Sequence, residues 1–258
     1  MENNTLVGKV AIVTGASRGI GRSIALRLAD GGVRLVLTAR SLAALQETAD
    51  LIRRKGAEVV LVATPEGDPE RVVLEATRAF GGIDILINNA GTTKSADFLS
   101  LTDEDWADGY RVKVFGATRL CRAAWPQLKE RRGSVINIGG VGGRAPDERF
   151  TIGGSVNAAV MAFTKALAQL GITDGVQVNC VNPGLIRTDR LTKRIADAAK
   201  RWSVSVEEAE AKMLLEHRIG RFGEPNEIAE LVAYIVSPSG RLLQGSLIDA
   251  DAGFNKGV

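Results

Sequence analysis

Two glycine-rich segments carry the residue types that hold a phosphate and leave room for a flat ring. The first reads Thr14-Gly15-Ala16-Ser17-Arg18-Gly19-Ile20-Gly21. A phosphate needs backbone N–H groups at a helix N-terminus with no Cβ in the way. Gly15 permits a tight exit from a strand, and Gly19 and Gly21 let the helix approach a ligand and the sheet. This pattern predicts a nucleotide site, and an ordinary glycine-rich turn is the alternative.

The second segment, Asn88-Asn89-Ala90-Gly91, directly follows an apolar run. In a doubly wound sheet the carboxyl ends of the central strands line the ligand crevice. Two asparagines placed there can bridge neighbouring strand ends, while Ala90 and Gly91 leave space for a flat ring. The pair of segments therefore predicts a dinucleotide site rather than an isolated turn.

Strands and helices must position these segments, and the chain alternates between the two throughout. Apolar runs rich in β-branched residues predict strands at 9–14, 34–38, 59–63, 83–88, 134–138, 176–181 and 246–249. Amphipathic patterns predict helices at 20–29, 42–54, 70–80, 103–131, 156–170 and 227–236. Strands that are apolar throughout and separated by helices predict an α/β fold, doubly wound, with a mostly parallel seven-stranded sheet covered on both faces.

The composition fits one large domain spanning residues 1–258. Hydrophobic residues make up 45% of the chain and charged residues 24%, which excludes intrinsic disorder. Thirty-three Lys and Arg against thirty Asp and Glu give a net charge of +3, too small and too evenly spread to predict a nucleic-acid surface. No apolar run approaches the roughly 18 residues of a membrane helix.

The start and the cysteines indicate where the protein acts. Residues 1–5 are polar and lack the layout of a signal peptide. Cys121 and Cys180 form no metal-spaced pair, which favours a reducing, cytoplasmic compartment. His217 is the one histidine, so the sequence predicts neither a metal site nor a Ser-His-Asp triad.

Further motifs complete a resemblance to a known family. The chain also contains Asn182-Pro183-Gly184 with Thr188, then Arg221-Phe222-Gly223-Glu224-Pro225, and Asp251-Ala252-Gly253. Together with the two glycine-rich segments, these motifs resemble the short-chain dehydrogenase/reductase family, of the 250-residue type, over roughly residues 7 to 254.

The resemblance implies a Rossmann-type domain with a nicotinamide dinucleotide lying over the sheet. It implies a substrate lid at about 187–222, where His217 lies, and a homo-oligomer, most often a tetramer, formed through the long helix and the helix 156–170. The implied cofactor-binding residues are Gly15, Ser17, Arg18, Gly19, Ile20, Gly21, Arg40, Asn89, Ala90, Gly91, Pro183, Gly184, Ile186 and Thr188.

The residues after the second predicted strand favour NADP(H) over NAD(H). An acidic residue there would bond the ribose 2′-OH and repel a 2′-phosphate, and this chain has Ala39-Arg40 instead. Arg18 adds a second guanidinium, which binds phosphate bidentately. The alternative is that both arginines are solvated surface charges.

The chain departs from the family at its catalytic residues. The family uses an Asn, a Ser, and a Tyr and Lys spaced YxxxK. This chain has only two tyrosines, Tyr110 and Tyr234, and neither is followed four residues later by lysine. The equivalent positions are Lys113, Gly140, Gly153 and Asn157, so the sequence predicts replacement of the whole set.

Two hypotheses follow from an intact cofactor loop beside a changed catalytic set. The first is an oxidoreductase for an unknown carbonyl or alcohol substrate with a non-standard active site, in which Lys113 and Asn157 are the candidate catalytic residues. We expect Lys113 to point toward the former catalytic set, where a desolvated amine titrates close to neutral pH. The second is a catalytically silent dinucleotide-binding protein, a sensor or a partner subunit of an active paralogue. Six glycines in residues 139–154 predict a flexible segment and a wide pocket.

Overall fold

A seven-stranded, entirely parallel sheet organises the protein. The computed structural model describes residues 6–64 and 68–257, and the polar start at 1–5 lies outside them. Within the described residues the strand order is β3-β2-β1-β4-β5-β6-β7. The strands are β1 (Val10–Thr14), β2 (Arg34–Ala39), β3 (Val59–Ala63), β4 (Ile85–Asn88), β5 (Ser134–Ile138), β6 (Gln177–Pro183) and β7 (Leu247–Ala250). The predicted doubly wound α/β fold is confirmed.

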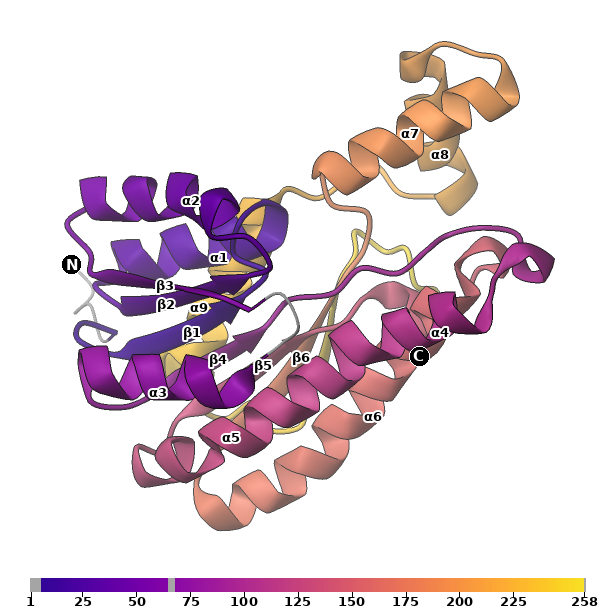
Figure 1. Ribbon diagram of the computed structural model, residues 1–258. Helices are drawn as coiled ribbons and strands as arrows, with labels where there is room; N and C mark the ends of the chain where they lie inside the picture. The colour runs from indigo at the N-terminus through magenta and orange to yellow at the C-terminus, as the bar shows by residue number, and fades with distance from the viewer. Residues whose placement is uncertain (1–5, 65–67, 258) are drawn as a thin grey trace.

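Helices cover both faces of this sheet, as Figure 1 shows. One layer consists of α1 (Gly19–Asp30), α2 (Leu42–Arg54) and α9 (Pro225–Val236), and the other of α3 (Pro69–Phe80), α5 (Gly116–Glu130) and α6 (Thr151–Asp174). Each layer has its own apolar core, because the inner strands present buried side chains to both sides. The carboxyl ends of β1 and β4 lie next to each other, since these strands pair in the middle of the sheet.

The long helix predicted at 103–131 contains a local widening that its pattern did not reveal. It consists of α4 (Asp103–Tyr110), a π turn η2 (Arg111–Phe115) and α5. A π turn inserts an extra residue into the helix and often marks a functional position. Lys113 lies in the middle of this turn.

Helix α6 begins at Thr151, five residues before the predicted start at Val156. Glycines have low helix propensity, which argued against including Gly153 and Gly154. Tertiary packing overrides that preference, because the Phe150 ring lies directly against Gly153.

Two helices that the sequence analysis did not predict lie in the expected lid region. They are α7 (Asp189–Trp202) and α8 (Val206–His217), and they extend beyond the carboxyl edge of the sheet (Figure 1). Ser205 begins α8 with a capping box in which Glu208 reciprocates. The pair encloses a small separate apolar cluster: Leu191, Ile195, Ala198, Ala199, Ala209, Met213, Ile219 and Phe222.

Two further observations concern the described residues only. None of their helices is both long and apolar enough to cross a membrane. They contain no group of three or more His, Cys, Asp or Glu side chains arranged to hold a metal ion.

Candidate functional site

Hydrogen bonds join the ends of β1 and β4 at the two glycine-rich segments. The Thr14 hydroxyl accepts hydrogen bonds from the backbone N–H groups of Asn89 and Ala90, each at 2.9 Å. The Asn89 side-chain amide donates back to the carbonyl oxygens of Thr14 at 2.9 Å and Gly15 at 3.2 Å. The glycine loop is therefore fixed in place by the segment that follows β4.

The glycines of the first loop are required by close packing. A Cβ on Gly21 would lie 2.3 Å from the Gly15 carbonyl oxygen and 2.4 Å from the Asn89 Nδ2 atom. Gly15 and Gly19 have φ angles of +64° and +55°, which disfavour other residues. Helix α1 starts at Gly19, and its N-cap residue Arg18 provides no side-chain capping bond. The first backbone N–H groups of α1 are thus suited to an anion, and the loop fits a dinucleotide pyrophosphate.

Asn88 bridges neighbouring strand ends, as expected of the asparagine pair, and a further hydrogen bond that was not predicted extends this link to α6. Its buried amide donates to Asn137 Oδ1 at 2.9 Å, and Asn137 donates to the Thr164 hydroxyl at 2.9 Å. These bonds cross from β4 to β5 and on to α6. They hold the strand ends and α6 in one register beneath the site.

The segment after β6 lies beside the glycine loop. Thr188 Cγ2 is 3.2 Å from the place that a Cβ on Gly19 would occupy. Ile186 forms an isolated parallel bridge with Gly223, and Gly184 packs against Asp251. Pro183, Gly184, Ile186 and Thr188 therefore lie at the same edge of the sheet as the two glycine-rich segments.

The two arginines predicted to mark the 2′-phosphate differ in their surroundings. Arg40 is exposed immediately after β2, the neighbour of β1 in the sheet. Arg18 is also exposed, but its guanidinium lies 3.5 Å from the Asp189 carboxylate at the start of α7. Arg40 thus makes no ion pair among the described residues, whereas Arg18 reaches toward α7.

Arg22 is a structural residue of the loop that the sequence analysis missed. Its guanidinium donates to the Ser17 carbonyl oxygen at 2.7 Å and forms a two-point ion pair with Glu47. Arg22 therefore ties the glycine loop to α2. Its place one residue after the last loop glycine was the available signal.

Lys113 reaches Asn157 across the site. Its ammonium donates to the Gly139 carbonyl oxygen at 2.7 Å and to Asn157 Oδ1 on α6. Its alkyl chain lies over Gly91, where an added Cβ would be 2.9 Å from Lys113 Cδ. The structure thus brings together the two candidate catalytic residues, and Lys113 points in the predicted direction.

The surroundings of Lys113 change its acidity. Burial lowers the pKa of the ammonium to about 8; Cys180 opposes this shift, and the positive charge of Arg190 adds to it. Desolvation lowers the pKa because the protein surroundings stabilise the charged ammonium less well than water does. Lys113 is accordingly still mostly protonated at pH 7 and able to lose its proton slightly above that pH.

Gly140 and Gly153, the positions predicted to be equivalent to the family's serine and tyrosine, are closely surrounded by neighbouring side chains. A Cβ on Gly140 would lie 2.8 Å from Asn157 Nδ2, and a Cβ on Gly153 would lie 2.0–2.3 Å from three atoms of the Phe150 ring. The prediction of a wide pocket at 139–154 is wrong, because neighbouring atoms fill the space beside these glycines, and the flexibility of the segment stays a prediction. Residues 139–154 contain short helical turns at Val141–Gly143 and Glu148–Phe150 and the start of α6. The glycines of this segment permit tight packing.

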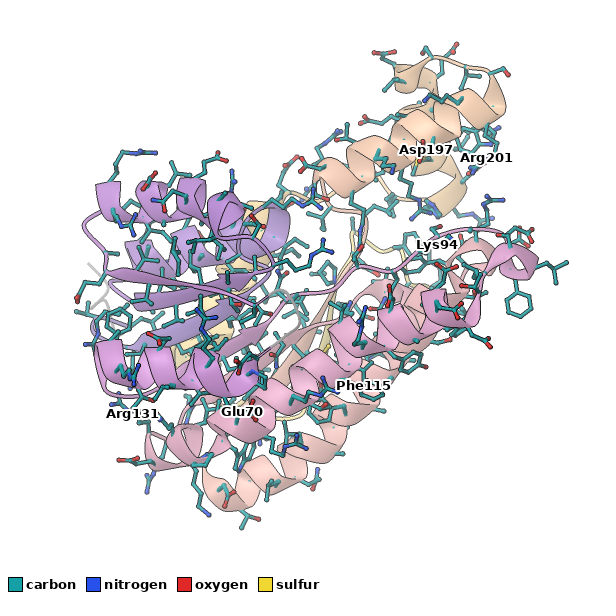
Figure 2. The ribbon with its side chains drawn as sticks, in the orientation of Figure 1. Glu70, Lys94, Phe115, Arg131, Asp197 and Arg201 are labelled. Carbon is teal, nitrogen blue, oxygen red and sulfur yellow. The ribbon has the colours of Figure 1, made fainter. Side chains whose placement is uncertain are left out.

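His217 lies in the last turn of α8, within the expected lid. Its ring packs against Phe254 with a centroid distance of 4.6 Å. Burial and the positive charge of Arg194 lower its pKa from the ordinary value. Figure 2 labels Asp197 and Arg201 on α7 and Lys94 on the loop after β4.

Comparisons with known proteins agree with this geometry. A family model described as enoyl-(acyl carrier protein) reductase matches residues 15–255. The 3-oxoacyl-acyl-carrier-protein reductase FabG of Vibrio cholerae is 36% identical over 249 residues, which cover 96% of this chain and 98% of that protein.

Solved structures show the same likeness. The L-sorbose reductase of Gluconobacter frateurii, complexed with NADPH and L-sorbose, is 34% identical with a TM-score of 0.93 over 100% of both chains. A short chain dehydrogenase of Burkholderia cenocepacia, in complex with NADP, is 31% identical with a TM-score of 0.85 over 97% of this chain and 99% of that one. With the glycine loop, the Asn88–Gly91 segment and the parallel sheet all in place, the chain belongs to the short-chain dehydrogenase/reductase family.

Proposed function

We propose that the protein is an NADP(H)-dependent oxidoreductase for a carbonyl or alcohol substrate, in which Lys113 replaces the usual phenol as the proton donor. The observation that carries this proposal is the position of the Lys113 ammonium, held between the Gly139 carbonyl oxygen and Asn157 Oδ1 with a pKa of about 8. A group that titrates near the working pH is well suited to general acid–base catalysis.

The cofactor part of the proposal rests on the loop geometry. The backbone at Gly15, Ser17, Arg18, Gly19, Ile20 and Gly21 would hold the pyrophosphate, and Asn89, Ala90 and Gly91 would border the ribose and ring. Pro183, Gly184, Ile186 and Thr188 would hold the nicotinamide end. NADPH in the Gluconobacter reductase and NADP in the Burkholderia dehydrogenase support the same cofactor here.

NADP(H) is proposed over NAD(H) because of Arg40. It follows β2, where a carboxylate would favour a free ribose 2′-OH, and it is exposed and able to meet a phosphate. Arg18 adds positive charge nearby, although Asp189 offsets part of it.

In the proposed mechanism the chain supplies the proton, directs it to the substrate oxygen and keeps water away from the reacting atoms. The nicotinamide, when bound, gives or takes the hydride. The Lys113 ammonium has three N–H groups, of which two are directed to Gly139 and Asn157, and the third donates to the substrate oxygen. As the carbonyl carbon gains hydride, its oxygen takes this proton and leaves Lys113 as the neutral amine. In the reverse direction the neutral amine accepts the alcohol proton.

Asn157 is proposed as a positioning residue and α7 with α8 as the lid. Asn157 Oδ1 fixes the direction of the lysine side chain, because an acceptor on the neighbouring helix removes its rotational freedom. The family has its asparagine on the long helix and its lysine on α6. This chain would keep the same two residue types in exchanged places, with Lys113 on the long helix and Asn157 on α6, while Gly140 and Gly153 stand at the other two positions. We also propose a cytoplasmic location and a tetramer, as the sequence and the family resemblance imply.

The second candidate is a catalytically silent NADP(H)-binding protein. Phe150 favours it, since its ring fills the space in which a side chain at position 153 would project. A sensor or a partner subunit needs the cofactor loop but no proton donor.

Turnover separates the two candidates. NADPH oxidation is followed with a panel of ketones, aldehydes and oxo-acyl thioesters, for the wild type, Lys113→Met and the surface control Lys129→Ala. Loss of a positioned acid typically costs ~10²–10⁴-fold in rate, so Lys113→Met should lose at least that much while Lys129→Ala retains the wild-type rate. No turnover by the wild type, with NADPH still bound, would favour the silent protein.

A further inference from the structure

We propose that Arg190, in the first turn of the lid helix α7, binds the cofactor pyrophosphate from the side opposite the glycine loop. In this arrangement α7 is itself part of the cofactor site. The proposal rests on the proposed function, because it requires that a dinucleotide bind over β1 and β4.

The first turn of α7 is already docked on the glycine loop. Thr188, its N-cap residue, packs against Gly19, and Asp189 pairs with Arg18 at 3.5 Å. The beginnings of α1 and α7 therefore meet at the same place. Arg190 is the second residue of α7 and projects from this junction.

Arg190 extends from this junction to the end of β4. Its Nη2 atom lies 3.4 Å from the carbonyl oxygen of Gly91, 99 residues earlier in the chain. The guanidinium thus spans the space between α7 and the Asn88–Gly91 segment, beside the ends of β1 and β4. A pyrophosphate held at the start of α1 would lie along this path.

The contact with Gly91 is a weak one. A distance of 3.4 Å is beyond the usual 2.7–3.2 Å for an N–H···O hydrogen bond. A phosphate offers ionised acceptors whose hydrogen bonds are shorter and roughly twice as strong. The Arg190 guanidinium would therefore gain a stronger hydrogen bond by exchanging the Gly91 carbonyl oxygen for a phosphate oxygen.

The positive charge of Arg190 also favours an anionic ligand at this place. Among the described residues Arg190 has no ion pair with Asp or Glu, whereas Arg18 has Asp189 and the preceding arginine of the segment, Arg187, has Glu210. Desolvation and the charge of Arg18 lower the pKa of Arg190, and Arg190 in turn lowers that of Lys113. Arg190 therefore repels both Arg18 and Lys113, and the negative charges of a pyrophosphate would relieve that repulsion.

Binding measurements test the proposed contact between Arg190 and the pyrophosphate, here called the clamp, without any need for a substrate. NADPH fluorescence titrations compare the wild type, Arg190→Gln, Arg190→Lys and the control Arg194→Gln, which alters the next turn of the same helix. We expect Arg190→Gln to weaken NADPH binding by about 10- to 100-fold, the effect of losing a hydrogen bond to a charged group. Arg190→Lys should fall between, because it keeps the charge without the fork, and Arg194→Gln should match the wild type.

A second ligand identifies the part of the cofactor that Arg190 contacts. Adenosine 2′-monophosphate carries the adenosine and the 2′-phosphate but neither phosphate of the pyrophosphate. Arg190→Gln should weaken its binding several-fold less than that of NADPH, whereas Arg40→Gln should weaken both equally. Hydrogen exchange of residues 189–202 should slow on NADPH binding in the wild type and much less in Arg190→Gln.

Several results would overturn the clamp. Equal NADPH affinity of the wild type and Arg190→Gln, with the wild type binding NADPH, would reject Arg190 alone and leave the proposed function intact. An equal loss for both ligands would place Arg190 at the adenosine end and reject the pyrophosphate contact. A wild type that binds neither NADPH nor NADH would reject the proposed function and the clamp together.

Discussion

Lys113 and Asn157, 44 residues apart in the chain, share a hydrogen bond between the π turn η2 and helix α6. The π turn places Lys113 against Gly91 and directs its ammonium to Gly139 and Asn157. The register of α6 is in turn set by the chain of hydrogen bonds through Asn88, Asn137 and Thr164. The contact is thus a consequence of the sheet as much as of the two helices.

The pH dependence of turnover should follow Lys113. Its pKa lies at about 8 because burial disfavours the ammonium, so the proton is present below that pH and lost above it. Carbonyl reduction should therefore fall as the pH rises through about 8, and alcohol oxidation should rise over the same range. Profiles of kcat/KM from pH 6 to 10 in both directions measure this, with Lys129→Ala as the control. Parallel profiles in the two directions would contradict a role for Lys113 as acid and base.

Gly153 and Phe150 should be energetically coupled. Gly153→Ala places a Cβ into the Phe150 ring, and such overpacking typically costs ~1–3 kcal/mol despite the better helix propensity of alanine. The double variant Phe150→Ala/Gly153→Ala should recover part of that loss, because the clash is removed. A double-mutant cycle by urea unfolding gives the coupling. Additive effects of the two substitutions would show that the ring moves aside without cost.

The same contact decides how the usual catalytic set can be reinstalled. The fourfold change Lys113→Asn, Gly140→Ser, Gly153→Tyr and Asn157→Lys restores the family's residue types but leaves Phe150 where the phenol must lie. We expect measurable ketone reduction only when Phe150→Ala is added. Assays of both variants, with folding checked by circular dichroism, compare them. Activity of the fourfold variant alone would contradict this expectation.

Arg40 should control the choice between NADPH and NADH. Arg40→Asp adds a charge that repels the 2′-phosphate and bonds the free ribose hydroxyl, so the preference for NADPH should shrink or reverse. Fluorescence titration with both cofactors measures the ratio of affinities. Arg53→Asp, on the exposed surface of α2, is the control and should leave the ratio unchanged. Equal affinities in the wild type, unaffected by Arg40→Asp, would remove the basis for NADP preference.

The protein should be a tetramer in solution. Phe115 at the end of η2 is 48% exposed and Ile172 on α6 is 63% exposed, and these are the two helices through which the family resemblance predicts association (Figure 2 labels Phe115). Light scattering should report about four times the 27.4 kDa chain mass, and Phe115→Arg should lower it. A 27 kDa species at micromolar concentration would exclude the tetramer.

The sequence by itself determined the fold and the location of the glycine loop Thr14–Gly21. Apolar runs of β-branched residues and helical periodicity are local properties, so β1, α1, β2 and α2 appear in the structure close to their predicted bounds. The loop Thr14–Gly21 works through backbone conformation and missing Cβ atoms, which the residue types themselves specify. The absence of YxxxK is also a plain property of the sequence.

Tertiary structure decided which side chains surround Lys113, Gly153 and Gly91. The contacts Lys113–Asn157 and Phe150–Gly153 depend on the π turn and the early start of α6, which have no distinct local pattern. Helix α7 does have an amphipathic pattern, but that pattern does not show that its first turn lies against the end of β4, as the contact Arg190–Gly91 requires. Arg190 and Gly91 are 99 residues apart, and no periodicity relates them. Only the sheet, by holding the ends of β1 and β4 side by side and anchoring α6 and α7 around them, brings these side chains within bonding distance.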